Sequence, residues 1–349
     1  MLVTMLELDG RVLRATWTVF LFVLVIALIY LTRSVLVIFT LAIFLAHLIA
    51  PLVDRVERHT PKRISRNVSL AIVYLALIGV ALAILIPVGA KIGEQASMLA
   101  SRLPEALKSD PLSRFPLPAW LETWRPRVGQ IIAQQTSGVG DEILPLLQKL
   151  GPGILAGLGS LVAVVLIPIF SFFFLKDGIL MRDAIVECFQ PRRQSLAEEI
   201  LADLHLLVAQ YIRALVLLAL AAFASYSIAL SALGAPYAIL LASVAGMLEL
   251  IPFVGPLVGG IVTLLVAALS GYDHLSWILI FLIVYRLFQD YVLSPYLLSA
   301  GVELHPLLVL FGVLAGEQVA GVPGMFFSVP VIAALRIVIV RMRRRKAHA

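Results

Sequence analysis

Three features are scarce in this chain: cysteine, charge and enzyme signatures. Cys188 is the only cysteine, which excludes a disulfide framework and a metal site built from several thiolates. Charged residues make up 14% of the chain, against roughly a quarter in an ordinary soluble domain. The sequence contains no H-E-x-x-H, G-x-x-x-x-G-K-S/T or G-x-S-x-G motif. We therefore expect neither an enzyme nor a bound cofactor or metal.

Apolar residues dominate instead. They make up 61% of the 349 residues, and the mean hydropathy of +1.02 indicates an all-α, multi-pass membrane protein. The net charge of +6 does not indicate a nucleic-acid partner, because the basic residues flank apolar segments, where they report orientation. The face formed by the N-terminus, 54–67, 176–209 and the tail is the richer in Lys and Arg per residue. This asymmetry predicts that both termini are cytoplasmic.

The stretch Pro236–Ser270 is apolar but is not built like a spanning helix. Its 35 residues are too few for two crossings of about 20 residues and too many for one. A carboxylate, Glu249, is followed within twelve residues by two prolines and three glycines, which favour a turn. We expect two half-helices joined by an irregular tip, forming a re-entrant hairpin. Such backbone persists at membrane depth only where protein or water covers it.

The remaining apolar segments predict six full spans, so that the two hairpins bring the total to about eight membrane segments. The spans are expected at about 17–31, 34–53, 68–90, 154–175, 211–233 and 275–298. Five regions follow. They are a three-span scaffold (1–90), an amphipathic extracytoplasmic segment (91–150), the fourth span with a cytoplasmic amphipathic segment (151–209), a transport region (210–340) and a basic tail (341–349). The tail is a topology anchor that can touch anionic membrane lipids.

An internal repeat is visible when the chain is shifted by about 70 residues. Pro236 then falls on Pro306, Ala245 on Ala315 and Gly246 on Gly316. Each unit is a full span followed by a broken apolar stretch, and the second broken stretch runs from His305 to Val340. The alternative is a chance match between apolar segments. If the repeat is real, the two units have opposite topology, which is the best sequence indication of a secondary transporter's binding site.

Glu249 is the first candidate site residue. An ionisable group inside a membrane segment is a functional hypothesis by default, and this carboxylate can carry a proton, bind a cation or contact a substrate. The alternative is that it caps nearby amides at the hairpin turn. Three residues of the tip share its neighbourhood and complete the first candidate group: Pro252, Gly255 and Pro256.

Two further groups carry polar side chains. Arg286, Gln289 and Asp290 lie on one span, and the four-residue spacing of Arg286 and Asp290 lets them pair, for binding or only to hide both charges from lipid. In the second broken stretch, His305 can shuttle protons or serve as an interfacial polar residue. The other candidates there are Glu317, Gln318, Pro323 and Gly324, of which the last two also suit a plain turn.

Four motifs resemble those of the bacterial autoinducer-2 exporter family. They are E-L-I-P-F-V-G-P at 249–256, Y-V-L-S-P at 291–295, L-H-P-L-L-V-L at 304–310 and G-V-P-G-M-F-F-S-V-P at 321–330. The resemblance implies an inner-membrane exporter, assembled as a homo-oligomer such as a pentamer, with an elevator-like moving part. Some relatives are described as sodium/proton antiporters. Most relatives carry another glycine where this chain has Glu317-Gln318, which implies a different substrate or coupling ion.

We therefore predict a secondary transporter that exports a small polar solute such as autoinducer-2 by alternating access. The first alternative is a monovalent cation/proton antiporter. The second, from another class, is a membrane scaffold or sensor that binds a partner through 91–150. The scaffold hypothesis requires the two broken stretches to pack without a polar cavity between them.

Overall fold

The computed structural model describes residues 10–59, 66–108, 161–298 and 304–347. The described residues are almost entirely helical and contain no strand, which confirms the all-α class. The helices are α1 (Gly10–Leu31), α2 (Arg33–His59), α3 (Arg66–Lys108), α6 (Leu161–Glu187), α7 (Pro191–Ala232), α8 (Ala238–Leu248), α9 (Val254–Leu269), α10 (Leu275–Phe288), the π-helical turn η2 (Gln289–Leu293), α11 (Ser294–Leu298) and α12 (Pro306–Ala347).

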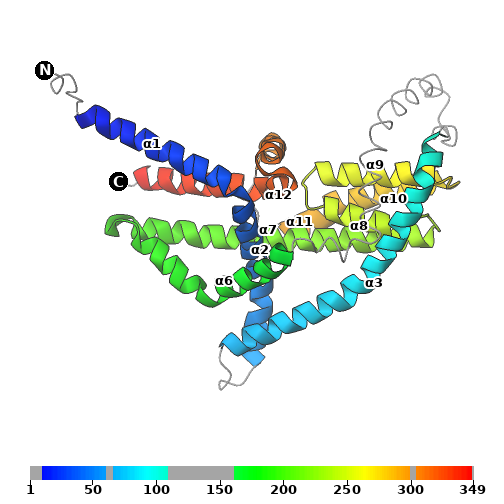
Figure 1. Ribbon diagram of the computed structural model, residues 1–349, viewed down its shortest axis with the longest axis horizontal. Coiled ribbons are helices and arrows are strands. Elements are labelled where there is room, and N and C mark those ends of the chain that lie inside the picture. The colour runs from blue at the N-terminus through cyan, green and yellow to red at the C-terminus, as the bar shows by residue number, and fades with distance from the viewer. Residues whose placement is uncertain (1–9, 60–65, 109–160, 299–303, 348–349) are drawn as a thin grey trace.

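Helix α7 is the axis of the molecule. It has 42 residues and is therefore about 63 Å long, roughly twice the thickness of a bilayer's hydrocarbon core. Pro191 starts it at the first helical turn, where a missing N–H costs nothing. Helices α8, α9 and α10 lie along its C-terminal half, while α2, α6 and the end of α12 lie near its N-terminal half (Figure 1).

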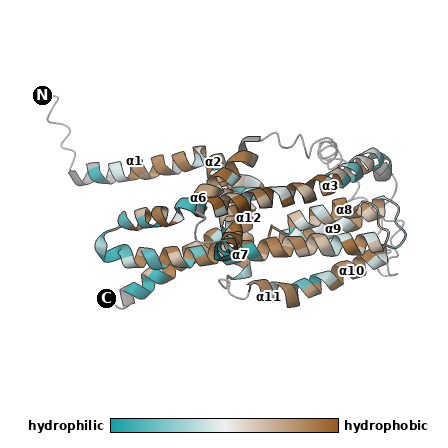
Figure 2. Ribbon diagram, turned by 90° about the horizontal axis from the view of Figure 1, so that it is seen from below, coloured by the Kyte–Doolittle hydropathy of each residue, from teal (hydrophilic) through white to brown (hydrophobic). Residues whose placement is uncertain are grey.

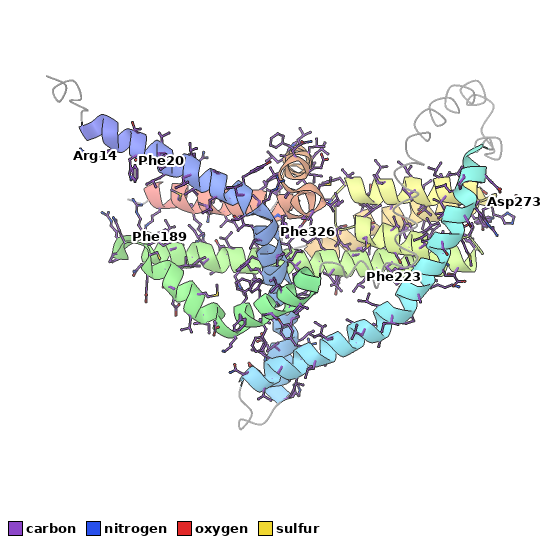
Figure 3. All side chains as sticks on the ribbon, viewed as in Figure 1. Arg14, Phe20, Phe189, Phe223, Asp273 and Phe326 are labelled. Atoms are coloured by element: carbon purple, nitrogen blue, oxygen red, sulfur yellow. The ribbon has the colours of Figure 1, made fainter. Side chains whose placement is uncertain are left out.

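The first broken stretch forms a helical hairpin. Helices α8 and α9 run antiparallel, joined by a turn in which Phe253 has a φ of 63°. Gly255 is required there, because a Cβ at this position would lie 1.7 Å from the carbonyl oxygen of Leu248. The hairpin packs on α7 through Gly246, whose missing side chain lets α8 approach Phe223 (labelled in Figure 3).

The second broken stretch also folds back on itself. Helix α12 loses helical geometry at Ala320 (φ −142°, ψ 18°) and Gly321 (φ 63°, ψ −143°). On either side of this break the backbones of Gly316 and Gly324 meet so closely that a Cβ on Gly316 would lie 2.2 Å from the Gly324 carbonyl oxygen. Both hairpins thus follow the same rule, in which glycine permits close antiparallel contact beside an irregular tip.

The two hairpins contact each other. Ile251, at the tip of the first, is buried in a cluster with Val309 and Val313 from the first arm of α12. Met325, from the other arm, packs against the same cluster. A separate aromatic contact joins α12 to α2, where Phe44 lies edge-on to Phe326 and Phe327 at ring-centroid distances of 5.3 and 4.8 Å. Phe326 lies near the centre of the molecule (Figure 3).

Several helices are longer than the sequence predicts. The third predicted span ends near Ala90, but α3 continues to Lys108. The fourth predicted span ends near residue 175, but α6 continues to Glu187. The cytoplasmic amphipathic segment predicted after that span is not separate from the fifth span as a helix, since α7 runs unbroken from Pro191. Charged residues end an apolar run, but they do not end a helix.

Five helical stretches are long and apolar enough to cross a membrane: Val35–His59, Asn67–Glu105, Pro191–Ala232, Leu275–Leu297 and Pro306–Arg345. Three shorter apolar helices accompany them, Thr16–Leu31, Ala238–Leu248 and Val254–Leu269. The predicted list of six full spans is therefore not matched one for one, since α6 is not among the five, and the last of the five is the folded-back α12. Residues 109–160, which hold most of the predicted amphipathic segment and the start of the fourth span, lie outside the described residues.

The surface fits a multi-pass membrane protein. Large apolar side chains are exposed along α1, the first half of α3 and the outer faces of α9 and α10. Hydrophilic residues gather where α6 ends, α7 begins and α12 ends, and again along the end of α3 (Figure 2). At the first of these places lies a set of ion pairs. There Arg341 forms a bidentate contact with Asp203, at 2.7 and 3.0 Å, and a third bond to Glu199 at 2.8 Å. These contacts fasten the last turns of α12 to α7.

Candidate functional site

A cavity of about 670 Å³ lies where the first hairpin, α7, α10 with η2, and α12 converge. Its walls are mostly apolar, with a few polar side chains, which is the usual composition of a small-molecule site. The tip of the first hairpin supplies Glu249, Pro252 and Pro256. The span that follows supplies Arg286, Gln289 and Asp290. Two candidate groups that the sequence predicts separately therefore line one cavity.

Glu249 is placed at the end of α8, where the helix gives way to the tip. The side chain is buried, and Gln289 Nε2 donates a hydrogen bond to Glu249 Oε1. Because an ionised carboxylate only accepts, the amide must turn its nitrogen toward Glu249 and its oxygen away. Gln289 is 3% exposed, and its Oε1 is buried with no hydrogen-bond partner among the described residues. The site thus holds a buried acceptor that no described side chain satisfies.

The π-helical turn explains how Gln289 and Asp290 come to face different surroundings. Proline at 295 has no N–H to continue the ladder, and η2 lies immediately before it, at Gln289–Leu293. Such turns are rare and are frequent at functional sites. Gln289 is buried against the hairpin tip, whereas Asp290 is exposed and pairs with Arg286, Nε to Oδ2 at 2.8 Å. The predicted pairing of Arg286 and Asp290 is therefore present, and both residues also line the cavity.

Helix α7 contributes three polar residues that the sequence reasoning missed: Gln210, Tyr211 and Arg213. The Tyr211 hydroxyl is buried without a hydrogen-bond partner among the described residues. These residues begin the predicted fifth span, where polar and aromatic side chains are normally taken as interfacial anchors. Their signal was the Q-Y-I-R run itself, in which two polar side chains and an arginine open an otherwise apolar segment.

Gly255 belongs to the tip but not to the cavity lining. Its contact with the Leu248 carbonyl makes it a structural requirement of the turn. Pro252 and Pro256 do line the cavity, so the tip serves both to close the hairpin and to form a wall.

The polar candidates of the second hairpin lie apart from this cavity. His305 accepts a hydrogen bond from the Leu307 N–H at 3.3 Å and so caps the start of α12. Glu317 and Gln318 are exposed and contact each other at 3.4 Å. Pro323 and Gly324 follow the tip, where Gly324 allows the close approach to Gly316. A binding role for these five residues stays a prediction. The second hairpin instead supplies apolar wall through Val309, Val329 and Ala333.

The described part of the chain contains no group of three or more His, Cys, Asp or Glu side chains suited to a metal ion. At the cavity, the chemistry on offer is hydrogen bonding and charge. One carboxylate and one amide oxygen are buried together, the buried phenol of Tyr211 lines the same cavity, and an ion pair and a further guanidinium, Arg213, are more exposed.

Comparison with known proteins agrees with this architecture. The model of a family described as "AI-2E family transporter" matches residues 19–344, nearly the whole chain. The "Putative transport protein YueF" of Bacillus subtilis is 26% identical over 317 residues, covering 86% of this chain and 84% of that protein.

Two other relatives match over shorter regions. The "Putative permease PerM" of Escherichia coli K12 is 27% identical over 205 residues, 58% of this chain and 56% of the relative. The "Putative transport protein YrrI" of Bacillus subtilis is 26% identical over 183 residues, about half of each chain. The match to the family model spans both hairpins and every residue of the cavity. The chain belongs to the AI-2E family of transporters.

Proposed function

We propose that this protein is a secondary transporter of the bacterial inner membrane that moves a small polar solute, such as autoinducer-2, by alternating access. The observation that carries the proposal is the cavity between the first hairpin tip and η2, which joins a buried carboxylate to irregular backbone at two places. Both termini are cytoplasmic in this proposal, as the distribution of basic residues predicts.

The two hairpins act as the inverted pair that such a transporter needs. Each enters and leaves on one face of the membrane, from opposite faces, and they meet through the Ile251–Val309–Val313 cluster. Solute binds in the cavity beside that cluster. The unit of α8–α12 then moves against α2 and α3, while the aromatic contact of Phe44 with Phe326 and Phe327 is remade.

Glu249 is the group that couples transport to an ion or selects the solute. Its charge lies in a buried environment with an amide as hydrogen-bond donor. Protonation or a bound cation therefore changes the electrostatic free energy of the site strongly. Arg286 and Asp290 neutralise each other at the cavity wall and set its polarity. Glu317 and Gln318 of the second hairpin act in a later conformation, in which the tip of that hairpin faces the route of the solute across the membrane.

The second candidate, a cation/proton antiporter, is favoured by the same buried carboxylate. It requires sodium-dependent proton movement without an organic cargo. The non-transporting scaffold is disfavoured, because it needs the two broken stretches to pack without a polar cavity, and the cavity is lined by both. We further propose that the protein works as a homo-oligomer.

The test is flux into proteoliposomes that contain the purified protein. Glu249→Gln keeps a side chain that can pair with Gln289 and removes the charge, so we expect a folded protein with transport lost or with an altered pH profile. Arg182→Gln, on α6 and outside the cavity, is the matched control and should transport normally. Unchanged transport and pH dependence in Glu249→Gln would remove the assigned role.

A further inference from the structure

The cavity's charges and unsatisfied atoms indicate which class of solute it takes, an inference that rests on the proposed transport function. Four ionisable side chains of clear sign line the cavity: Glu249 and Asp290 are acidic, and Arg213 and Arg286 are basic. The formal charges therefore cancel. A site selective for a simple anion or a simple cation would carry an excess of the opposite sign.

The charges are not arranged symmetrically. Arg286 and Asp290 bond to each other, which leaves Glu249 and Arg213 as the charges without a charged hydrogen-bond partner within the described residues. Glu249 is 6% exposed, whereas Arg213 is exposed. The cavity therefore has a buried acidic end and an open basic end.

At the buried end of the cavity, the acceptors outnumber the donors, so a solute that binds there must supply a hydrogen-bond donor. Gln289 donates its amide N–H to Glu249, and its Oε1 remains buried and unpartnered among the described residues. Burying an acceptor without a donor is costly, and burying a carboxylate is costlier where the nearest cation, Arg286, is already bonded to Asp290. A ligand ammonium group satisfies both, because it brings three donors and one positive charge. The Tyr211 hydroxyl, which lines the same cavity and is also unpartnered in the described chain, is a further acceptor.

At the open end of the cavity, a solute that binds Arg213 must supply a hydrogen-bond acceptor. A guanidinium has five donors and no acceptor, so Arg213 is suited to a carboxylate or phosphate oxygen. Between the two ends the wall is apolar, with side chains such as Leu207, Leu218 and Val309. We propose that the cavity binds a zwitterionic solute with an apolar body, its ammonium on Glu249 and Gln289 Oε1 and its anionic group on Arg213, which narrows the proposed small polar solutes to a class without autoinducer-2.

Three probes of one carbon skeleton test this assignment: leucine, isoamylamine, which lacks the carboxylate, and isocaproate, which lacks the ammonium. Binding to the purified full-length protein in detergent is measured by isothermal titration calorimetry. We expect leucine to bind about tenfold or more tightly than either of the others, because each deletion removes one charge-assisted contact. Equal or tighter binding of isoamylamine or isocaproate, or no binding of leucine to the folded protein, would overturn the assignment.

Two variants identify the ends. Arg213→Gln should reduce the affinity for leucine to that for isoamylamine and leave the affinity for isoamylamine unchanged. Glu249→Gln should weaken the binding of both leucine and isoamylamine and leave the binding of isocaproate unchanged. Arg182→Gln should change none of the three. If Arg213→Gln weakens isoamylamine as much as leucine, the assignment of the basic end is wrong. The transport proposal fails separately, when a cavity residue is reachable from one side of the membrane only.

Discussion

A double-mutant cycle measures how much the hydrogen bond between Gln289 and Glu249 contributes to the free energy of unfolding. Gln289→Leu leaves a carboxylate buried without its donor. Since Glu249 is 6% exposed, water from the cavity replaces only part of the lost bond, and we expect a loss of about 2–3 kcal/mol in unfolding free energy. Glu249→Leu removes the charge but leaves the Gln289 amide N–H unpartnered as well, at a cost of about 1–3 kcal/mol.

The double variant Glu249→Leu/Gln289→Leu should be less destabilised than the sum of the two single losses. Replacing both partners by apolar groups removes the desolvation penalty along with the bond, so we expect a coupling of about 1.5–3 kcal/mol. Unfolding is followed by circular dichroism in detergent micelles titrated with a denaturing detergent. Glu249→Gln, which can still pair, is the control and should lie near the wild type. Additivity of the single losses to within about 0.5 kcal/mol would refute a direct, buried contact.

Two further predictions concern the frame around the site. Gly255→Val should prevent the first hairpin from closing and abolish stable expression, because its Cβ would lie 1.7 Å from the Leu248 carbonyl oxygen; Gly79→Val, with nothing within 4 Å, should express normally. Comparable expression of both variants would contradict the close contact. Arg341→Gln should free the end of α12 from Asp203 and speed its tryptic cleavage, while Arg343→Gln, which makes no such contact, should not; equal cleavage rates would count against the fastening.

The two helix breaks could be predicted from sequence because their cause is local. Prolines and glycines act on the backbone of their own turn, so the first break falls among the predicted residues near Pro252, while the second lies at Ala320–Gly321, just before the predicted turn at Pro323-Gly324. Helix lengths could not be predicted in the same way. Lys91 and Glu94 lie beyond the apolar run of the third span, yet they pair at 2.8 Å on a helix that continues past them. The polar segments therefore prolong helices that the hydropathy pattern alone would end.

The site was predictable in its parts but not in its assembly. Glu249 and Gln289 each stand out as polar residues in apolar segments, yet their contact spans 40 residues and depends on how the hairpin packs. Tyr211 and Arg213 join them because α7 runs unbroken past the cavity, which no local pattern shows. Conversely, Glu317 and Gln318 fall opposite Met247 and Leu248 in the repeat, beside Glu249, but the fold places them on an exposed surface.

Alternating access requires that the cavity beside η2 opens to each side of the membrane in turn. Ser294 lines the cavity and can be replaced by cysteine with little change in size, in a chain whose single cysteine, Cys188, has been changed to serine. A membrane-impermeant maleimide is applied to right-side-out and to inside-out vesicles, with Ser270→Cys, at the far end of α9, as the one-sided control. We expect Ser294→Cys to be labelled from both sides and Ser270→Cys from one. Labelling of Ser294→Cys from a single side, with and without solute, would contradict it.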